Sequence, residues 1–154
     1  MQNTNGNAGR TTDVVIVGCG RVGSRLARTM ADEGYAVAVV DMDQHSFRRL
    51  PDNFRGRTVL GTGIDEDVLR RAGIAQAKTF IAVSDNDNMN IMAAQIAQKV
   101  FNVPDVVARV YEVERARAFA QLGLKVVCPT ATVASLIREQ VSLPPSGGAR
   151  TNSA

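Results

Sequence analysis

Short apolar runs alternate with longer segments of helical periodicity between residue 13 and about residue 140. The apolar runs are rich in β-branched residues, and in the segments that follow them apolar residues recur every three or four positions. Apolar strands that alternate with amphipathic helices are typical of a parallel sheet covered on both faces. The predicted strands are residues 13–18, 36–41, 57–60, 78–83, 105–110 and 124–128.

A helix is predicted after each of these strands. The expected helices are residues 21–33, 44–50, a helix opened by the acidic residues 65–67, and residues 87–100, 113–122 and 130–140. Two of them carry apolar stripes, formed by Val22, Leu26 and Met30 in the first helix and by Met89, Met92, Ile96 and Val100 in the fourth. We therefore expect these stripes to be the apolar faces of the two helices.

Right-handed crossovers leave few ways to connect six such β–α units. The best match is a single-domain α/β fold of the Rossmann-like, doubly wound class, with a parallel six-stranded sheet in the order 3-2-1-4-5-6. Ligands of these sheets bind beyond the carboxyl ends of the strands, at the point where the strand order reverses. The residues at those strand ends are therefore the candidate binding residues.

A glycine-rich loop follows the first strand, and a helical pattern begins directly after it. In the dinucleotide-binding fingerprint, the first glycine permits a tight turn, the second lets the backbone approach a pyrophosphate, and the third lets helix and strand pack closely. The free N–H groups and positive dipole end of the helix then face the phosphates. The predicted phosphate-binding residues are Gly18, Cys19, Gly20, Arg21, Val22 and Gly23. The alternative is a glycine-rich turn without a ligand.

An acidic residue, Asp41, ends the second strand near the offset of about 20 residues that the fingerprint requires. Its carboxylate can accept hydrogen bonds from both ribose hydroxyls. Its charge is expected to repel a 2′-phosphate, which favours NAD-like or adenine nucleotides over NADP. Met42 and Asp43 complete this predicted ribose end, with capping of the helix at 44–50 as the alternative role of Asp43.

Two arginines lie at strand ends where a cation needs a counter-charge. Arg21 in the first turn of a helix opposes the helix dipole, so we expect it either to pair with phosphate groups or to face solvent. Arg109 interrupts the apolar run of the fifth strand, and we expect it to hold phosphate or to contact a neighbouring subunit.

Small and polar residues follow the third and fourth strands. Gly61, Thr62 and Gly63 are predicted to lie beside the adenine, where small residues admit a flat ring; a simple turn is the alternative. The cluster at residues 84–88 is expected chiefly to cap the next helix, while Ser84 and Asp85 also contact the ligand.

Composition narrows the functional classes. The 154 residues suit one domain, and no apolar run approaches the roughly 20 residues that span a bilayer, so no direct membrane insertion is expected. The formal charge of +3 comes from basic residues interleaved with acids, which argues against nucleic-acid binding. Cys19 and Cys128 are expected to be reduced thiols, with redox sensing by Cys19 as an alternative. No metal-binding cluster is evident.

The two ends of the chain are polar. We expect residues 1–12 to be a disordered N-terminal segment, residues 13–140 to form the folded domain, and residues 141–154 to be a flexible tail or linker. The N-terminal segment has no secretory signal, so a cytoplasmic location is expected.

The sequence lacks the residues that catalysis on a bound cofactor would need. There is no second domain to bring a catalytic acid or base to a nicotinamide, and the nearest approach to a Tyr-x-x-x-Lys pair is Tyr111 with Arg115. We therefore predict a binding protein that is not an enzyme. The alternative is the cofactor-binding half of an NAD-dependent oxidoreductase.

Several motifs together resemble one family. They are residues 15–23 (Val-Ile-Val-Gly-Cys-Gly-Arg-Val-Gly), 40–43 (Val-Asp-Met-Asp), 61–65 with 68–73, 82–90 and 122–129. In these segments the chain resembles the N-terminal RCK or KTN domain, also called TrkA-N, of Trk/Ktr-type potassium-transport regulators. The similarity covers about residues 12–140.

The resemblance implies a cytoplasmic regulatory subunit that binds NAD(H), ATP or ADP and gates a membrane potassium channel or transporter. It implies dimers that build higher rings, with attachment to the inner membrane only through the transporter partner. It also implies phosphate contacts at residues 18 and 20–23, ribose contacts at Asp41, adenine contacts at Thr62 and a position near the phosphates for Arg109.

The chain departs from the family pattern in two places. Some members carry a glutamate after the proline of the sixth strand that takes part in cation binding, whereas this chain has Thr130. Members usually continue into a smaller C-terminal effector domain, and this sequence ends in the polar tail. The sequence is therefore expected to be either an excised domain or a single-domain member that needs a partner.

Overall fold

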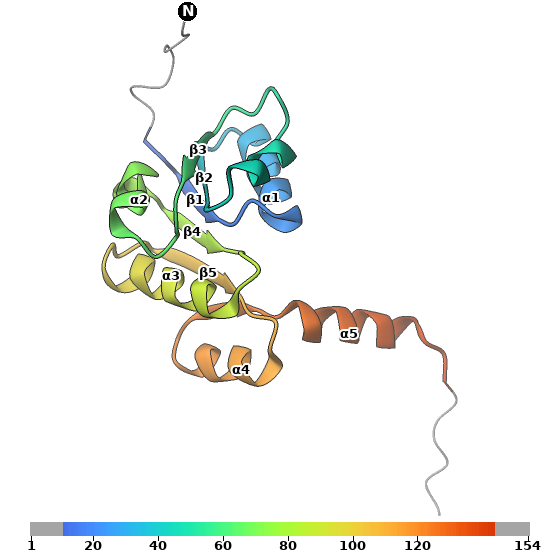
Figure 1. Ribbon diagram of the computed structural model, residues 1–154. Coiled ribbons are helices and arrows are strands. Elements are labelled where there is room, and N and C mark those ends of the chain that lie inside the picture. The colour runs from blue at the N-terminus through green and yellow to red at the C-terminus, as the bar shows by residue number, and fades with distance from the viewer. Residues whose placement is uncertain (1–10, 144–154) are drawn as a thin grey trace, which may run out of the picture.

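The computed structural model describes residues 11–143 (Figure 1). Six strands are present: β1 (Val14–Val17), β2 (Val37–Asp41), β3 (Arg57–Leu60), β4 (Thr79–Ala82), β5 (Asp105–Arg109) and β6 (Lys125–Val127). They form one parallel sheet in the order β3-β2-β1-β4-β5-β6. The predicted α/β class and the doubly wound strand order are confirmed.

The helices also lie where the periodicity predicts them. They are α1 (Arg21–Asp32), α2 (Glu66–Arg71), α3 (Asp87–Lys99), α4 (Val113–Gln121) and α5 (Pro129–Gln140), with two 3-10 helices, η1 (Gln44–Arg49) and η2 (Ile74–Gln76). The first and last residues of the predicted elements agree with the observed ones to within one or two residues. The predicted terminal segments 1–12 and 141–154 lie mostly outside the described residues.

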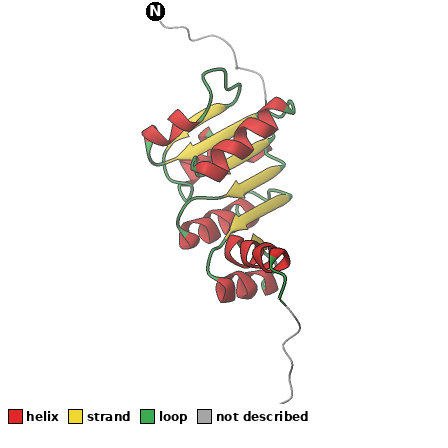
Figure 2. Cartoon of the chain, turned by 90° about the vertical axis from the view of Figure 1, so that its right-hand side faces the viewer, coloured by secondary structure: helices red, strands yellow, loops and turns green. Residues whose placement is uncertain are grey.

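Helices lie on both faces of the sheet (Figure 2). On one face, α1 and η1 pack over β1 and β2 through Ala27, Leu26 and Phe47. On the other face, α2 and α3 pack over a larger core that includes Phe80 and Leu69. Burial on both sides explains why every residue of β1 is buried and why its sequence is uniformly apolar.

The strand register brings the loops of the candidate site to one edge of the sheet. Val17 at the end of β1 pairs with Val40 in β2 and with Ala82 in β4. The residues that follow these three positions therefore emerge side by side, on either side of the point where the strand order reverses. This point is where doubly wound sheets bind their ligands.

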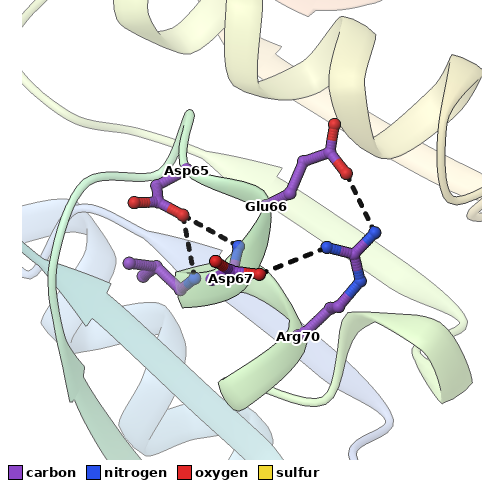
Figure 3. A network of polar contacts seen from close by, with 5 residues as sticks. Asp65, Glu66, Asp67 and Arg70 are labelled. Atoms are coloured by element: carbon purple, nitrogen blue, oxygen red, sulfur yellow. Dashed lines mark hydrogen bonds and ion pairs between the residues drawn. The ribbon is translucent and has the colours of Figure 1, made fainter.

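The acidic start of α2 behaves as the sequence predicts (Figure 3). The Asp65 carboxylate caps the helix by accepting hydrogen bonds from the N–H groups of Asp67 and Val68, at 2.8 and 3.3 Å. Arg70, one turn further on, forms ion pairs with Glu66 at 2.9 Å and Asp67 at 3.4 Å. Because these pairs are exposed, they stabilise α2 only modestly.

The predicted apolar stripe of α1 is only partly correct. Leu26 and Met30 pack against the core, but Val22 is 44% exposed, and Gly23 and Ala27 are the residues buried against the sheet. The close approach of Gly23 to the backbone of the glycine loop fixes the rotation of the helix and turns Val22 outward.

The predicted stripe of α3 is only partly correct, because Ile96 packs against the core but two other residues of the stripe do not. Met92 and Val100 are each 49% exposed, while small residues such as Ala94 and Ala97 are fully buried. Small side chains let α3 approach the sheet closely, so the large residues lie at the rim of the interface. The spacing of the large apolar residues therefore predicted the buried face of α3 only in part.

The last helix, α5, extends away from the sheet instead of covering it (Figure 1). All of its residues from Thr130 to Gln140 are exposed. Helix α4, in contrast, packs on the sheet through Ala116 and Phe119. Of these two helices, only α4 therefore covers the sheet.

The assignment of the buried face of α3 can be tested by substitution. Ala94→Leu is expected to lower the free energy of unfolding by roughly 1–3 kcal/mol, because the added atoms have no room against the sheet. Met92→Gln is expected to change it by less than about 0.5 kcal/mol, because half of that side chain is already in solvent. Urea denaturation of the two variants measures both effects, and equal losses would contradict the assignment.

Candidate functional site

A cleft of about 620 Å³ lies beyond the carboxyl ends of β1, β2 and β4. It sits at the reversal of strand order, and its volume is in the range of small-molecule sites. Most of the predicted site residues line it: Gly18, Gly20, Arg21, Val22, Asp41, Met42, Asp43, Gly61, Gly63, Ser84, Asp85 and Arg109. Three predicted residues, Cys19, Gly23 and Thr62, do not line it.

The three glycines of the first loop have different surroundings. Gly18 has a φ of +101°, and a Cβ there would lie 2.6 Å from the backbone nitrogen of Ser84. A Cβ on Gly23 would lie 1.8 Å from the carbonyl oxygen of Gly18. A Cβ on Gly20, in contrast, would meet no atom within 4 Å. Gly18 and Gly23 thus keep strand and helix together, whereas Gly20 keeps the cleft open.

The N-terminus of α1 faces this opening. Gly20 is the N-cap residue, and no side chain caps the helix. The first-turn amides and the positive end of the helix dipole are therefore presented to the cleft, which is the arrangement that binds phosphate groups. Arg21 adds an exposed guanidinium at the same place, and in residues 11–143 no carboxylate lies within 4 Å of it.

The Asp41 carboxylate joins the two loops that form the ribose end of the cleft. One oxygen accepts a hydrogen bond from the Cys19 N–H at 2.7 Å, and the other accepts one from the Asp43 N–H at 2.8 Å. These bonds fix the position and orientation of the carboxylate. Each oxygen retains a lone pair, so the group can still accept hydrogen bonds from ligand hydroxyls.

Cys19 contributes its backbone to the site, while its side chain contacts the core. The thiol is fully buried among apolar residues under α1. Burial and, to a smaller extent, the negative charge of Asp41 raise the pKa of Cys19 to about 11, while Arg49 opposes the shift. The thiol therefore stays protonated at neutral pH, which disfavours redox sensing because the thiolate is the reactive form.

Two polar groups at strand ends cap the elements that follow, which was the alternative role of Asp43 and the main expectation for residues 84–88. The Asp43 carboxylate accepts a hydrogen bond from the His45 N–H at 2.9 Å and so caps η1. The Asn86 side chain accepts one from the Met89 N–H at 3.1 Å and caps α3. Both loops still line the cleft, so capping holds the cleft walls in place.

Arg109 connects two strands at the far end of the cleft. Its guanidinium donates to the carbonyl oxygens of Val83 at 2.7 Å and Ser84 at 2.9 Å, and it stacks on the Tyr111 ring at 4.8 Å. Its Nε is buried without a hydrogen-bond partner among the described residues. Arg109 thus orients the loop after β4 and presents its remaining cationic surface to the cleft.

Asn90, which was not predicted as a site residue, holds the loop after β4 in place from a buried position. It is fully buried, and its amide donates to the carbonyl oxygens of Ser84 at 2.8 Å and Arg109 at 3.0 Å. Its oxygen accepts from the N–H and the hydroxyl of Ser84. An asparagine between the apolar neighbours Met89 and Ile91 was the available signal, because a buried amide requires partners of this kind.

Other lining residues were also missed: Val17, Val40, Ser46, Arg49, Val83 and Met89. The valines lie at the ends of β1, β2 and β4 or one residue away from them, so their place followed from the topology. Ser46 and Arg49 belong to a 3-10 helix, in which every third side chain points the same way. The sequence predicts only a helix at residues 44–50, without this spacing of side chains.

The fold and this cleft define a class: a doubly wound domain of the dinucleotide-binding type. The chain belongs to the TrkA-N domain family, whose model matches residues 14–129.

A similar curated protein is the Trk system potassium uptake protein TrkA of Streptomyces coelicolor. It is 51% identical over 114 residues, which cover 74% of this chain and 51% of that protein. The chain thus spans about half the length of this relative.

Solved structures support the fold. The TrkA-N domain of the inner membrane protein ybaL from Escherichia coli superposes with a TM-score of 0.75 at 21% identity, covering 86% of this chain and 98% of that domain. The GsuK channel bound to NAD gives a TM-score of 0.64 at 20% identity, covering 79% of this chain and 22% of the channel. GsuK bound to ADP gives 0.63 at 20% identity, covering 77% and 31%.

Residues 11–143 contain neither a membrane-spanning helix nor a group of metal ligands. No helix in residues 11–143 has the length and apolar character needed to cross a bilayer. Within the same residues, no three His, Cys, Asp or Glu side chains are grouped as a metal site would require.

The different roles of Gly20 and Gly23 give a matched pair of substitutions. Gly23→Ala is expected to lower the free energy of unfolding by roughly 1–3 kcal/mol or more, because the new methyl group would collide with a backbone oxygen. Gly20→Ala is expected to cost less than about 1 kcal/mol, since alanine there enters open space and is only a poorer N-cap. Thermal and urea unfolding measure both, and a Gly20→Ala loss as large as that of Gly23→Ala would contradict these roles.

Proposed function

We propose that this chain is the nucleotide-sensing domain of a potassium-transport regulator. It binds NAD(H) or an adenine nucleotide such as ATP or ADP in the cleft, and the bound ligand controls a membrane potassium channel or transporter. One observation carries the proposal: in a chain of this family, the fixed Asp41 carboxylate and the uncapped N-terminus of α1 face the same cleft.

The donors and acceptors of the cleft fit such a ligand. The Asp41 carboxylate would accept from the ribose hydroxyls, and the amides after Gly20, with Arg21, would donate to the phosphates. The adenine would lie beside Gly61 and Gly63, which line the same end of the cleft. The open space at Gly20 is the room that the phosphates need.

The related proteins and structures favour the same ligands and the same process. The GsuK structures contain NAD and ADP, and the Streptomyces relative is named as a potassium uptake protein. Because this chain spans about half of that protein, the transported ion and the transporter partner are part of the proposal. A cytoplasmic domain held at the inner membrane by its transporter is the arrangement that this role requires.

We propose a binding role without catalysis. The cleft lining contains no His, Lys or Cys side chain within the described part of the chain. Of its three acids, Asp41 and Asp43 are engaged by backbone N–H groups, and Asp85 is exposed at the rim. A sensor needs only that its ligands bind two conformations with different affinities. Ligands with different numbers of phosphate groups would differ in their attraction to Arg21 and Arg109.

Self-association through α5 is a further part of the proposal. Val133, Leu136 and Ile137 lie on one face of α5 and are 51%, 55% and 60% exposed. Val127 in the neighbouring edge strand β6 is 50% exposed. An unpartnered apolar helix beside an exposed strand residue suits contact with a second copy of the chain, as dimers that build a ring require.

Ligand binding tests the function most directly. Titration calorimetry of the wild type with ADP, ATP and NADH is expected to show binding to one site. Asp41→Ala is expected to weaken each ligand by roughly 10- to 100-fold, the effect of losing a hydrogen bond to a charged group. Asp32→Ala, which removes an exposed acid at the other end of α1, serves as the control. Unchanged affinities in Asp41→Ala, with the variant folded, would rule out this mode of binding.

The α5 interface is tested by sedimentation equilibrium. The wild type is expected to form a dimer, and Ile137→Glu is expected to raise the dimer dissociation constant at least about tenfold by placing a charge in an apolar contact. Ser135→Glu adds the same charge to the same helix on the side opposite the apolar face and is expected to have little effect. A wild type that stays monomeric at its highest soluble concentration would exclude the interface.

A further inference from the structure

The ribose end of the cleft contains a cation that the dinucleotide-binding fingerprint does not include. Arg49 lines the cleft together with Ser46, Asp41 and Asp43. It belongs to η1, which follows β2 directly and is fastened to it through the Asp43 cap and the hydrogen bond from the Ser46 N–H to the Asp43 carbonyl, 3.0 Å. The position of Arg49 is therefore set by the same loop that contains the ribose-binding acid.

The 3-10 geometry of η1 determines which side chains reach the cleft. With three residues per turn, positions i and i+3 lie in line along the helix. Ser46 and Arg49 form one such row, and both line the cleft. His45 and Arg48 form the next row, and both line a separate surface hollow on the outer side of η1. Of the two adjacent arginines, only Arg49 lines the cleft and can contact a ligand bound there.

The charge of Arg49 is not already taken up by Asp41. Across residues 11–143 neither side chain has an ion-pair partner within 4 Å, and both oxygens of Asp41 accept backbone N–H groups. Both charges nevertheless act on the same buried thiol with opposite sign, which places them at the same end of the cleft. A ligand there would meet an acceptor on one side and a cationic donor on the other.

We propose that Arg49 and Ser46 form a subsite for a phosphate group on the 2′-oxygen of the ribose, so that the cleft accepts 2′-phosphorylated dinucleotides in spite of Asp41. An acid at this position favours a free 2′-hydroxyl, and a nearby arginine accommodates a 2′-phosphate. This chain has both groups. The guanidinium would pair with the phosphate oxygens, and the Ser46 hydroxyl would donate a further hydrogen bond. The inference rests on the proposed nucleotide function and specifies its ligand class.

NADH and NADPH differ only by the 2′-phosphate, so their affinities isolate this subsite. The full 154-residue chain is titrated with each ligand, by the fluorescence of the nicotinamide ring, as wild type, Arg49→Gln and Arg48→Gln. Both substituted residues are exposed, so both variants are expected to fold. In Arg49→Gln, the ratio of the NADPH to the NADH dissociation constant is expected to rise about tenfold, the effect of one charge-assisted hydrogen bond. In Arg48→Gln, the ratio is expected to stay within about twofold of the wild type.

The outcomes separate this inference from the function on which it rests. Binding of NADH without NADPH by the wild type would overturn the inference and leave the proposed function standing. A ratio that Arg49→Gln leaves unchanged, or that both variants change equally, would also overturn it, because the effect would then be absent or would come from the general surface charge. Failure of the wild type to bind either ligand would overturn the proposed function and the inference together.

Discussion

The hydrogen bonds of the Asp41 carboxylate determine the geometry of the site. One oxygen holds the amide of Cys19 in the first loop, and the other holds the amide of Asp43 in the second. The glycine loop and the loop after β2 are thereby locked into one unit, with the N-terminus of α1 at its centre. The Asp41 carboxylate thus has two roles, because the hydrogen bonds that fix the two loops also orient its free lone pairs for a ligand.

The opposite wall of the cleft is organised by neutral and cationic groups. Asn90 in α3 and Arg109 in β5 donate hydrogen bonds to carbonyl oxygens of the loop after β4. A helix and the neighbouring strand therefore both hold that loop in place. The Tyr111 ring stacks on Arg109, and the Tyr111 carbonyl lies 3.5 Å from Sγ of Cys128, the N-cap residue of α5. This wall of the cleft and the start of the exposed helix are thus in direct contact, which places the proposed nucleotide site next to the proposed interface.

The sequence predicted the fold and most of the cleft because both follow from strand ends. Apolar β-branched runs, crossover handedness and the glycine loop suffice to place Gly18 and Asp41 at one edge of the sheet. Helix rotation was predicted poorly, because close contacts of small residues such as Gly23 decide it and periodicity favours large ones. Asn90 and Arg49 were missed for a related reason: their roles depend on burial and on three-residue helical spacing, which appear only when the chain is folded.

The central claim is that a nucleotide lies with its phosphates at the N-terminus of α1 and its ribose at Asp41. Titration of the ¹⁵N-labelled chain with ADP, followed through backbone amide resonances, tests both contacts at once. The account predicts saturable shifts of the amides of Cys19, Gly20, Arg21 and Val22, with the amides of α4 unchanged. Shifts confined to other surfaces, with these amides unmoved at saturation, would contradict it.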